Sequence, residues 1–454
     1  MTLKRLDLTT ENTAMLVRQL RAQAGEDEGL RYRVEEILGR VRENGDQALI
    51  EFTRKFDCED FRLEQLRVPV EEIEAAREAS SEPLMESLKL AAENVRLFHQ
   101  HEMRGSWTAT MRQNQMLGQR MIPVDRAGLY VPGGAASYPS TVIMTAVPAQ
   151  VAGVREIFIC SPPGRDGRVS QPVLAAAALL GIDEVYAVGG AQAVAAMAYG
   201  TASVPSADVI CGPGNVYVTE AKRQVFGLTG LDSLAGPSEV VIIADNSAQP
   251  DLIAADLLAQ VEHGSGAVAV LVCWSQELAG RVEEAVPKLA RELDIAEGRV
   301  QRIALVLVGG GQLGTRIDDA GEEKPVTPLD VAVGFSNEFA PEHLQIHTEQ
   351  PEQVLHEITC AGAVFLGEDV CTAYGDYIIG SNHVLPTAGT ARFGSALSVE
   401  NFLRKVAVIS LTPETITQLT PALSEIATAE GLKAHARAAQ LRLERFGKTE
   451  EEEE

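Results

Sequence analysis

The stretch from Arg155 to Gly227 decides the fold, since it contains in order REIFICSPP, PVLAAAALLGI, DEVYAVGG, AQAVAAMAYG, ADVICGPG and VYVTEAKRQVFG. Short apolar runs, which are typical of buried strands, alternate with alanine-rich segments of helical length. This β-α-β-α alternation predicts a parallel sheet with helices on both faces. The same alternation returns in SEVVIIAD, DLIAADLLAQVEHG and AVAVLVCW, which span residues 238–274. The sequence therefore predicts an α/β fold with two doubly wound, Rossmann-like domains.

The flanking residues have a different character and suggest how the chain is divided. Residues 11–104 are expected to be helical, because their apolar residues recur with a period near 3.6. The last fifty or so residues are also expected to be helical, with Thr420-Pro421 as a helix start. The predicted organisation is an N-terminal segment 1–24, a first domain 25–130 with 238–395, a second domain 131–237 and a C-terminal helical segment 396–454 with an acidic tail.

The composition is that of an ordinary globular protein, and the charge is strongly acidic. Hydrophobic residues make up 45% of the 454 residues, and 39 Lys and Arg against 64 Asp and Glu give a formal net charge of -25. The phosphates of nucleic acids and anionic membranes repel such a chain, so we expect neither as a partner. The first residues lack the apolar core of a signal peptide, and the 6 cysteines form no CxxC pair. We expect reduced, mostly buried thiols and a cytoplasmic protein.

Glycine-rich turns follow three of the predicted strands. They are YVPGG from Tyr130, VGGAQA from Val188 and CGPGN from Cys211. Open α/β sheets bind ligands at the carboxyl ends of their strands, where free backbone N–H groups can hold a phosphate. Each turn alone is equally typical of a plain βα connection, but three together favour a nucleotide crevice. The run GGGQLG from Gly309 also matches G-x-G-x-x-G, yet no helical pattern follows it. We expect an exposed loop over residues 311–330 instead.

Two short segments carry side chains suited to metal binding and proton transfer. Gln260 and His263 lie three positions apart in LLAQVEHG, so on a helix they share one face near its end. Imidazole can ligate Zn²⁺, although Gln is an uncommon ligand, and an ordinary polar helix end remains the alternative. In APEHL, Glu342 and His343 place a carboxylate beside an imidazole, which suits general acid–base catalysis. A helix start that favours Glu through the helix dipole is the alternative there.

A third polar segment, GDYIIGSNHVLPT, carries Asp376 and His383 among glycines and a proline. Polar residues in such surroundings form either a turn or a site, and the segment alone leaves this open.

Together these segments resemble the histidinol dehydrogenase family. The matching stretches, in family order from about residue 32 to 446, are GLYVPGGAASYPS, VGGAQAVAAMAYGT, GPGNVYV, LAGPSE, LLAQVEHG, APEHL, GDYIIGSNHVLPT with TARFGS, and EGLKAHA. The resemblance implies oxidation of L-histidinol to L-histidine with two NAD⁺ through an enzyme-held aldehyde, with one Zn²⁺ per subunit. It also implies the final step of histidine biosynthesis, and a homodimer whose C-terminal segment crosses to the partner.

The resemblance also implies roles for individual residues. Those that resemble the zinc ligands are Gln260, His263, Asp376 and His435. Those that resemble the catalytic proton-transfer pair are Glu342 and His343, and those that resemble the NAD contacts are Tyr130, Gln192 and Asn215. Those that resemble substrate contacts are Ser238 and Glu430, alongside the zinc ligands and His343.

The spacing of Glu430 and His435 requires an interruption of the helix between them. Glu430 and His435 are five positions apart, which places them about 140–150° around a continuous helix. Gly431 lies between them, so we expect one helix to end at Glu430 and the next to carry His435.

Two other functions remain open. A relative that oxidises sulfonated diols such as sulfopropanediol would share the NAD and zinc segments but would need cationic groups for the sulfonate. A non-catalytic acidic scaffold would not need the full set of polar residues. The intact APEHL and GDY segments favour the histidinol form over both.

Overall fold

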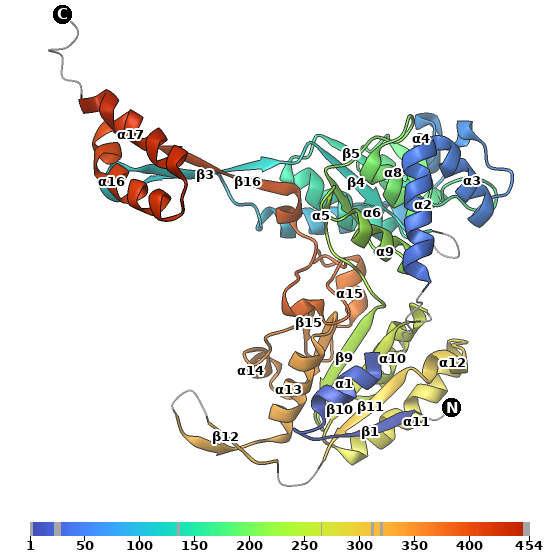
Figure 1. Ribbon diagram of the computed structural model, residues 1–454. Helices are drawn as coiled ribbons and strands as arrows, with labels where there is room; N and C mark the ends of the chain where they lie inside the picture. The colour runs from blue at the N-terminus through green and yellow to red at the C-terminus, as the bar shows by residue number, and fades with distance from the viewer. Residues whose placement is uncertain are drawn as a thin grey trace, which may run out of the picture. The chain divides into compact units, whose positions relative to one another are not determined.

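The structure is a computed structural model that describes residues 3–21, 29–133, 137–264, 266–309, 313–317 and 321–447 (Figure 1). The chain divides into two compact units. We call Met1–Glu102 with Asp125–Phe402 the body, and Met103–Val124 with Leu403–Glu454 the tail.

The first sheet of the body is five-stranded and parallel. Its strands are short and, apart from one two-residue edge strand, mostly buried, as expected for apolar runs covered on both faces. In spatial order they are β6 (Val185–Ala187), β5 (Glu156–Ser161), β4 (Arg126–Tyr130), β7 (Val209–Cys211) and β8 (Gly230–Leu231). The connecting helices are α6 (Pro139–Ala152), α7 (Gln171–Leu179), α8 (Gly190–Tyr199) and α9 (Val216–Val225). The predicted alternation of strand and helix is confirmed here.

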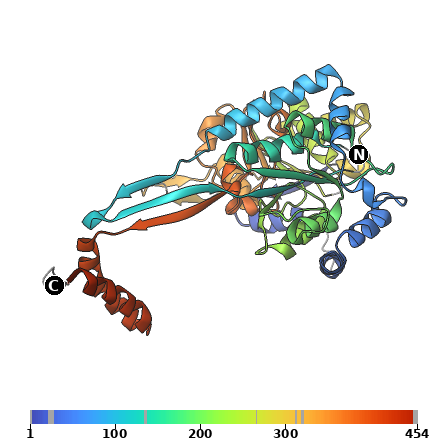
Figure 2. The same ribbon diagram turned by 90° about the horizontal axis from the view of Figure 1, so that it is seen from above.

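The N-terminal helices pack on this same sheet. They are α2 (Leu30–Asn44), α3 (Asp46–Phe56), α4 (Val70–Glu78) and α5 (Glu82–Gln100). Helix α2 packs on α8 and α9, α3 packs on α8, α4 packs on α7, and α5 packs on α6 (Figure 2). This packing differs from the predicted grouping of residues 25–130 with 238–395. The apolar faces of these helices are covered by the helices of the five-stranded sheet, and β4 belongs to that sheet too.

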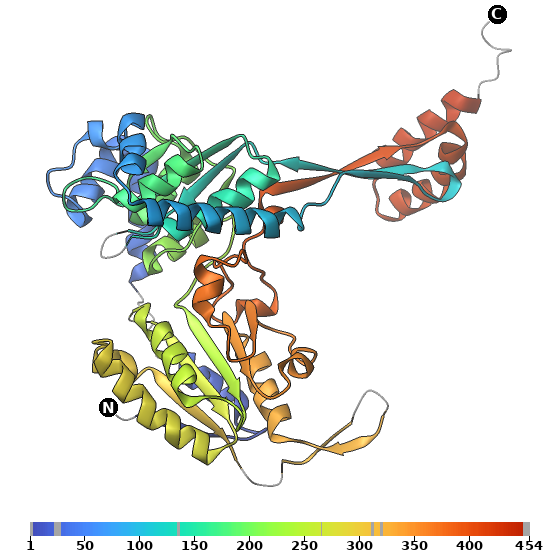
Figure 3. The same cartoon turned by 180° about the vertical axis from the view of Figure 1, so that it is seen from behind.

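The second sheet of the body is six-stranded and also parallel (Figures 1 and 3). Its strands in spatial order are β1 (Lys4–Leu8), β11 (Ile303–Val308), β10 (Val268–Cys273), β9 (Glu239–Ala244), β14 (His343–His347) and β15 (Ala363–Leu366). Two apolar cores cover its faces. One core contains α10 (Pro250–Glu262) and α11 (Gln276–Glu292), and the other contains α1 (Thr13–Arg21) and α13 (Pro328–Phe339).

Shorter elements join these layers. They are α12 (Glu297–Val300), α14 (Pro351–Leu355), α15 (Thr372–Tyr377), and the 3₁₀ turns η2 (Leu63–Gln65), η4 (Thr390–Arg392) and η5 (Val399–Phe402). Within the predicted loop 311–330, β12 (Thr315–Ile317) and β13 (Glu323–Pro325) form an exposed antiparallel hairpin. Residues 310–312 of GGGQLG lie outside the described residues. A strand rather than a helix begins after Gly314, so the expectation that no nucleotide-binding helix starts there is confirmed.

The tail combines a three-stranded antiparallel sheet with two helices that pack on each other (Figure 2). The sheet order is β16 (Leu403–Ser410), β3 (Met116–Pro123) and β2 (Trp107–Thr110), with η3 (Arg112–Asn114) between β2 and β3. The helices are α16 (Pro413–Ala429) and α17 (Lys433–Gly447).

Two predictions for the tail are wrong and one is confirmed. The C-terminal segment begins with strand β16, because residues 403–410 pair with β3, far away in the sequence. Helix α16 begins at Pro413 with Thr412 as its N-cap, so Pro421 lies inside the helix. Gly431 adopts a left-handed φ of 77° between the two helices, with Glu430 as the C-cap of α16. The predicted break between Glu430 and His435 is therefore confirmed.

Searched over the residues that the structure describes, the helices include none that is long and apolar enough to cross a membrane. All 6 cysteines are free thiols, and four of them are buried.

Candidate active site

One cavity of about 440 Å³ in the body brings together most of the residues singled out from the sequence. It lies at the carboxyl edge of the five-stranded sheet, where Tyr130 ends β4 and Asn215 follows β7. It also lies at the amino edge of the six-stranded sheet, where Ser238 precedes β9 and His343 begins β14. The predicted site residues among its lining are Tyr130, Asn215, Ser238, His263, Glu342, His343 and Asp376.

The strand order of the five-stranded sheet reverses at the edge that lines this cavity. From β4 the chain moves outward through β5 and β6, and then returns to β7 and β8 on the other side of β4. Ligands of open α/β sheets bind where the strand order reverses in this way. Tyr130 lies at that point and accepts a hydrogen bond from the Gly190 N–H at 3.1 Å through its hydroxyl oxygen. Burial raises the pKa of Tyr130 to about 12, so the phenol stays protonated.

The turn after β7 depends on glycine. Gly212 has a φ of +114°, and a Cβ there would lie 2.0 Å from the Tyr130 carbonyl oxygen. Asn215 then caps α9, because its side-chain oxygen accepts the N–H groups of Tyr217 at 3.0 Å and Val218 at 3.2 Å. The cap uses the oxygen of this amide and not its NH₂ group.

Glu342 and His343 form a buried carboxylate–imidazole pair. The Ser238 hydroxyl donates to Glu342 Oε2 at 2.5 Å, and the Glu239 N–H donates to the same oxygen at 2.9 Å. Burial raises the pKa of Glu342, although the neighbouring His343 opposes the rise. Burial alone would lower the pKa of His343, but the carboxylates of Glu342 and Asp376 outweigh it and raise this pKa to about 9.

The positions of the two ring nitrogens of His343 differ. Nδ1 lies 3.2 Å from the Glu239 carbonyl oxygen and 3.5 Å from Glu342 Oε2. Nε2 lies 3.4 Å from Asp376 Oδ1. A carbonyl can only accept, so Nδ1 carries the hydrogen in the neutral ring and the lone pair is on Nε2.

Asp376 is surrounded by imidazoles. Burial alone would raise its pKa, but the neighbouring His343, which is positively charged when protonated, lowers it together with His383 and His263. His383 donates through Nδ1 to the Asp376 carbonyl oxygen at 2.9 Å and also lines the cavity. The resemblance implies no role for His383, and the signal that could have singled it out is its place in the same polar segment as Asp376, between SN and VLP.

The body supplies some, but not all, of the side chains that a metal site would need. The described residues include no cluster of three or more His, Cys, Asp or Glu side chains that could hold a metal. His263 and Asp376 contribute an imidazole and a carboxylate, and the Gln260 amide is the third donor expected in the body. Gln260 is buried, and its Nε2 atom has no hydrogen-bond partner among the described residues. A fourth ligand must come from outside this set for tetrahedral or higher coordination.

The remaining predicted site residues lie elsewhere. Gln192, on α8, is buried and does not line the cavity, and the same holds for Gln260 on α10. Glu430 and His435 belong to the tail, where both are exposed.

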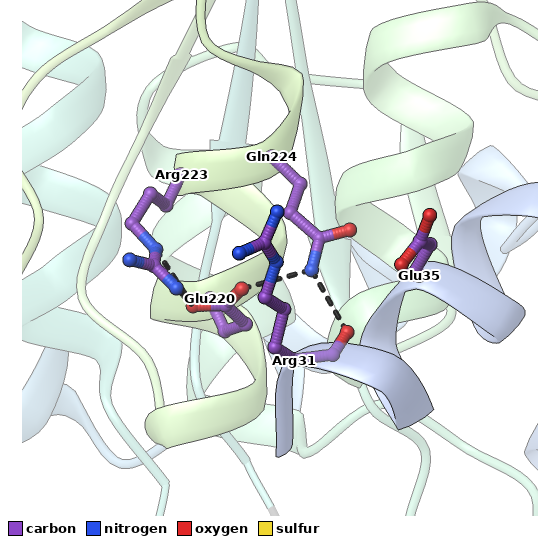
Figure 4. A pocket seen from close by; sticks show the side chains of 5 residues that line it. All are labelled: Arg31, Glu35, Glu220, Arg223 and Gln224. Atoms are coloured by element: carbon purple, nitrogen blue, oxygen red, sulfur yellow. Dashed lines mark hydrogen bonds and ion pairs between the residues drawn. The ribbon is translucent and has the colours of Figure 1, made fainter. Parts of the chain in front are cut away.

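A separate surface hollow of about 390 Å³ between α2 and α9 is lined by Arg31, Glu35, Glu220, Arg223 and Gln224 (Figure 4). Two of its charged side chains, Arg223 and Glu220, pair with each other. Arg223 Nε donates to Glu220 at 2.8 Å, and Gln224 donates to Glu220 at 2.8 Å and to the Arg31 carbonyl at 3.0 Å. None of these residues lines the cavity described above.

Two doubly wound sheets and a cavity at the reversal of strand order are typical of the dinucleotide-binding class of α/β enzymes, and the buried carboxylate–imidazole pair in that cavity suits proton transfer. The model of the histidinol dehydrogenase family matches residues 20–443. The chain therefore belongs to the histidinol dehydrogenase family, and it is an NAD-dependent oxidoreductase.

Individual relatives agree with this assignment. A histidinol dehydrogenase from Synechococcus sp. is 47% identical over 413 residues, covering 90% of this chain and 91% of the relative. One from Halalkalibacterium halodurans is 47% identical over 411 residues, with 90% and 93% covered. The crystal structure of histidinol dehydrogenase from Elizabethkingia anophelis matches with a TM-score of 0.89 at 32% identity, covering 98% of this chain and 99% of that one. The resemblance inferred from the motifs is confirmed.

Proposed function

We propose that this chain carries out the zinc-dependent, four-electron oxidation of L-histidinol to L-histidine through histidinal with two NAD⁺, the final step of histidine biosynthesis. The observation that supports this most is the Glu342–His343 pair, which Ser238 holds in a cavity at the reversal of strand order. We place the reaction in the cytoplasm, where buried free thiols such as Cys160 and Cys211 stay reduced.

His343 is the proposed base of both oxidations. The Glu239 carbonyl holds the hydrogen on Nδ1, so Nε2 is the basic atom of the neutral ring, whose fraction grows as the pH approaches the pKa of about 9. In that form Nε2 can take the substrate's hydroxyl proton while hydride leaves carbon for NAD⁺. The first oxidation yields the aldehyde and one NADH. The second removes hydride from the hydrated aldehyde and yields the acid.

Glu342 is the proposed group that assists water addition to the aldehyde. Burial raises its pKa, which brings the carboxylate closer to the basicity that proton transfer near neutral pH requires. Glu342→Gln should therefore slow oxidation of histidinal more than the first oxidation of histidinol. Steady-state rates on each substrate test this, and equal losses on both would reject the division of roles.

The proposed zinc ligands are Gln260, His263, Asp376 and His435, and the bound metal would orient the imidazole and amine of histidinol. The proposed NAD contacts are Tyr130, Gln192 and Asn215, and the further substrate contacts are Ser238 and Glu430. No Lys or Arg is among the described residues that line the cavity, which disfavours a sulfonated substrate.

NADH formation measured by absorbance tests the proposal directly. We expect turnover with histidinol, none with sulfopropanediol, and loss of turnover with a metal chelator that returns when Zn²⁺ is added. Turnover of sulfopropanediol in place of histidinol would overturn the substrate assignment.

We further propose a homodimer in which each site receives Glu430 and His435 from the tail of the partner. The apolar side chains of the tail that are exposed in the single chain support it, notably Trp107, Val406, Ile409, Ile426 and Leu441. Near Asp376, the side chains of Tyr374, Tyr377 and Ile379 are also about half exposed. A symmetric dimer would cover both sets at once.

Subunit exchange separates this arrangement from a tail that serves its own chain. His263→Ala and His435→Ala are each expected to be inactive alone. In a mixed dimer with crossed tails, one site carries both lesions and the other none, so random exchange should restore roughly a quarter of wild-type activity. No recovery despite exchange shown by mass tagging would reject the crossed tail.

A further inference from the structure

A row of buried polar side chains lies between α10 and β14. On α10, the buried Asp256 and Gln260 are spaced i and i+4, and the exposed C-cap residue His263 continues the same face at i+7. On β14, His343, Gln345 and His347 alternate with apolar residues and therefore share one face of the sheet. The rows meet at one end, where His347 Nε2 lies 3.8 Å from Asp256 Oδ2. At the other end, His263 and His343 both line the cavity.

Several polar atoms in this row make no hydrogen bond within 3.5 Å to the residues that the structure describes. They are Gln260 Nε2, both amide atoms of Gln345 and both ring nitrogens of His347, all shielded from solvent. On the neighbouring strand β9, the residues in register with Gln345 and His347 are Ile242 and Ala244. The site could therefore have held apolar side chains at lower cost, since buried polar groups without partners are strongly unfavourable. Small side-chain shifts or single internal waters would connect these atoms.

The Gln260 amide could point either its oxygen or its NH₂ group at the metal position, and the polar residues of this row can determine which. An amide offers an oxygen acceptor and an NH₂ donor, which are nearly the same size, and a metal accepts only the oxygen. Something beside Gln260 must therefore bind its NH₂ group. Gln345 is the buried amide in the row on β14, and Asp256, which lies beside that row, can only accept hydrogen bonds when it is ionised.

We propose that Asp256 and Gln345 orient the Gln260 amide, so that its oxygen and not its nitrogen faces the metal position. The carboxylate of Asp256 binds the Gln345 NH₂ group, the Gln345 oxygen then accepts from Gln260 Nε2, and Gln260 Oε1 is left for the cation. Asp256 and Gln345 are thus positioning residues. The inference rests on the proposed function, because it takes Gln260 as a ligand.

The charges around Asp256 agree with this direction. Burial raises the pKa of Asp256 to about 7, and the Gln345 amide opposes the rise, as expected of a donor aimed at the carboxylate. Burial lowers the pKa of His347 to about 4 against the charge of Glu368, so this imidazole is neutral and can act as a further donor. At pH 8 Asp256 is therefore mostly a carboxylate, and His347 beside it is neutral.

Zinc affinity of the full-length protein at pH 8, measured by competition with a chromogenic chelator, tests the inference without relying on turnover. Asp256→Asn and Gln345→Met should each weaken Zn²⁺ binding by about 10- to 100-fold, the usual effect of removing a group that orients a ligand. Ser336→Ala is the matched control, since its hydroxyl is equally buried and without a partner but lies on α13, across the sheet. It should leave the affinity unchanged.

A double-mutant cycle separates positioning from general loosening of the fold. Gln260→Ala removes the amide that Asp256 is proposed to orient, so adding Asp256→Asn to it should cost no further affinity. A further loss of equal size in that background would overturn the inference, and so would wild-type affinity in both single variants. A wild-type protein that binds no Zn²⁺ would reject the metal part of the proposed function, and the inference with it.

Discussion

The two sheets of the body are wound in the same way but present opposite edges to the cavity. The five-stranded sheet contributes its carboxyl edge, through the residues after β4 and β7, and the six-stranded sheet contributes its amino edge, through the residues at the start of β9 and β14. The carboxyl edge of the six-stranded sheet is occupied by its own contacts. Asp245 accepts the N–H of Glu349 at 3.0 Å, and Glu368 accepts the N–H of Gln249 at 2.9 Å.

This difference separates two kinds of chemistry. The five-stranded side is built from glycine turns, helix starts and backbone N–H groups, which suit a phosphate-bearing cofactor. The six-stranded side is built from buried ionisable side chains, including Glu239, Glu342 and His343, whose pKa values are all raised. We therefore expect changes on the six-stranded side to act on rate and pH behaviour, and changes on the other side to act on folding and cofactor affinity.

The largest effect is expected at His343. His343→Asn keeps the size of the side chain roughly but removes the base, so kcat should fall by about 10²- to 10⁴-fold for both oxidations. The exposed His356, converted to Asn in the same way, is the control and should leave kcat unchanged. Stopped-flow measurement of NADH formation checks this, and a loss confined to KM would break the contrast between the two sides.

Gly212→Ala should mainly harm the fold. Its Cβ would overlap the Tyr130 carbonyl oxygen, and its φ of +114° is unfavourable for alanine, so we expect a loss of at least about 3 kcal/mol of unfolding free energy. Gly309→Ala is the counterpart, because a Cβ there meets nothing closer than the Leu8 carbonyl oxygen at 3.7 Å. Urea unfolding and the KM for NAD⁺ should be nearly unchanged in Gly309→Ala. A raised KM there would restore GGGQLG as a cofactor site.

Glu239 should make stability depend on pH. Burial raises its pKa to about 7, although Arg21, whose Nε lies 3.3 Å from its carboxylate, opposes the rise. The native state then binds more protons than the unfolded chain between about pH 4.5 and 7, so the unfolding free energy falls as pH rises through that window, by up to about 3 kcal/mol. Glu239→Gln should flatten this slope in denaturant titrations at several pH values. An unchanged slope would show that other groups cause it.

The smallest effect is expected at Asn215. Asn215→Ser keeps a capping oxygen for α9 but removes the NH₂ group, so the KM for NAD⁺ should rise by about 2- to 12-fold, the value of one hydrogen bond, without loss of stability. Asn215→Ala removes the cap as well and should also lower the unfolding free energy by about 1 kcal/mol. If Asn215→Ser leaves KM unchanged, Asn215 acts only as a cap.

Local sequence patterns predicted the body well, because each strand and helix there carries its own periodicity. The turns at Tyr130, Val188 and Cys211 were located because glycine marks the strand ends where the backbone must turn. Strand β16 was missed because its partner β3 lies almost three hundred residues earlier, and no local pattern reports such a pairing. The start of α16 was misplaced because Thr412-Pro413 and Thr420-Pro421 carry the same capping signal.

The site was predicted less completely than the fold. The family resemblance, and not the motifs alone, implied that Glu342, His343 and Asp376 belong to one site, and all three line the same cavity. Gln345 and His347 were not singled out, since two polar residues in a short run do not indicate whether the run is buried. Their burial follows only from α10 lying over β14, which is a property of tertiary packing.

The pairing of β3 with β16 also concerns synthesis of the chain. Strands β2 and β3 leave the ribosome early, and residues 403–410 leave it only near the end. Throughout that interval the edge of β3 is an unsatisfied template beside apolar side chains such as Trp107 and Met116. The nascent protein therefore has a period of vulnerability to aggregation that is set by translation time, and slower elongation would lengthen it.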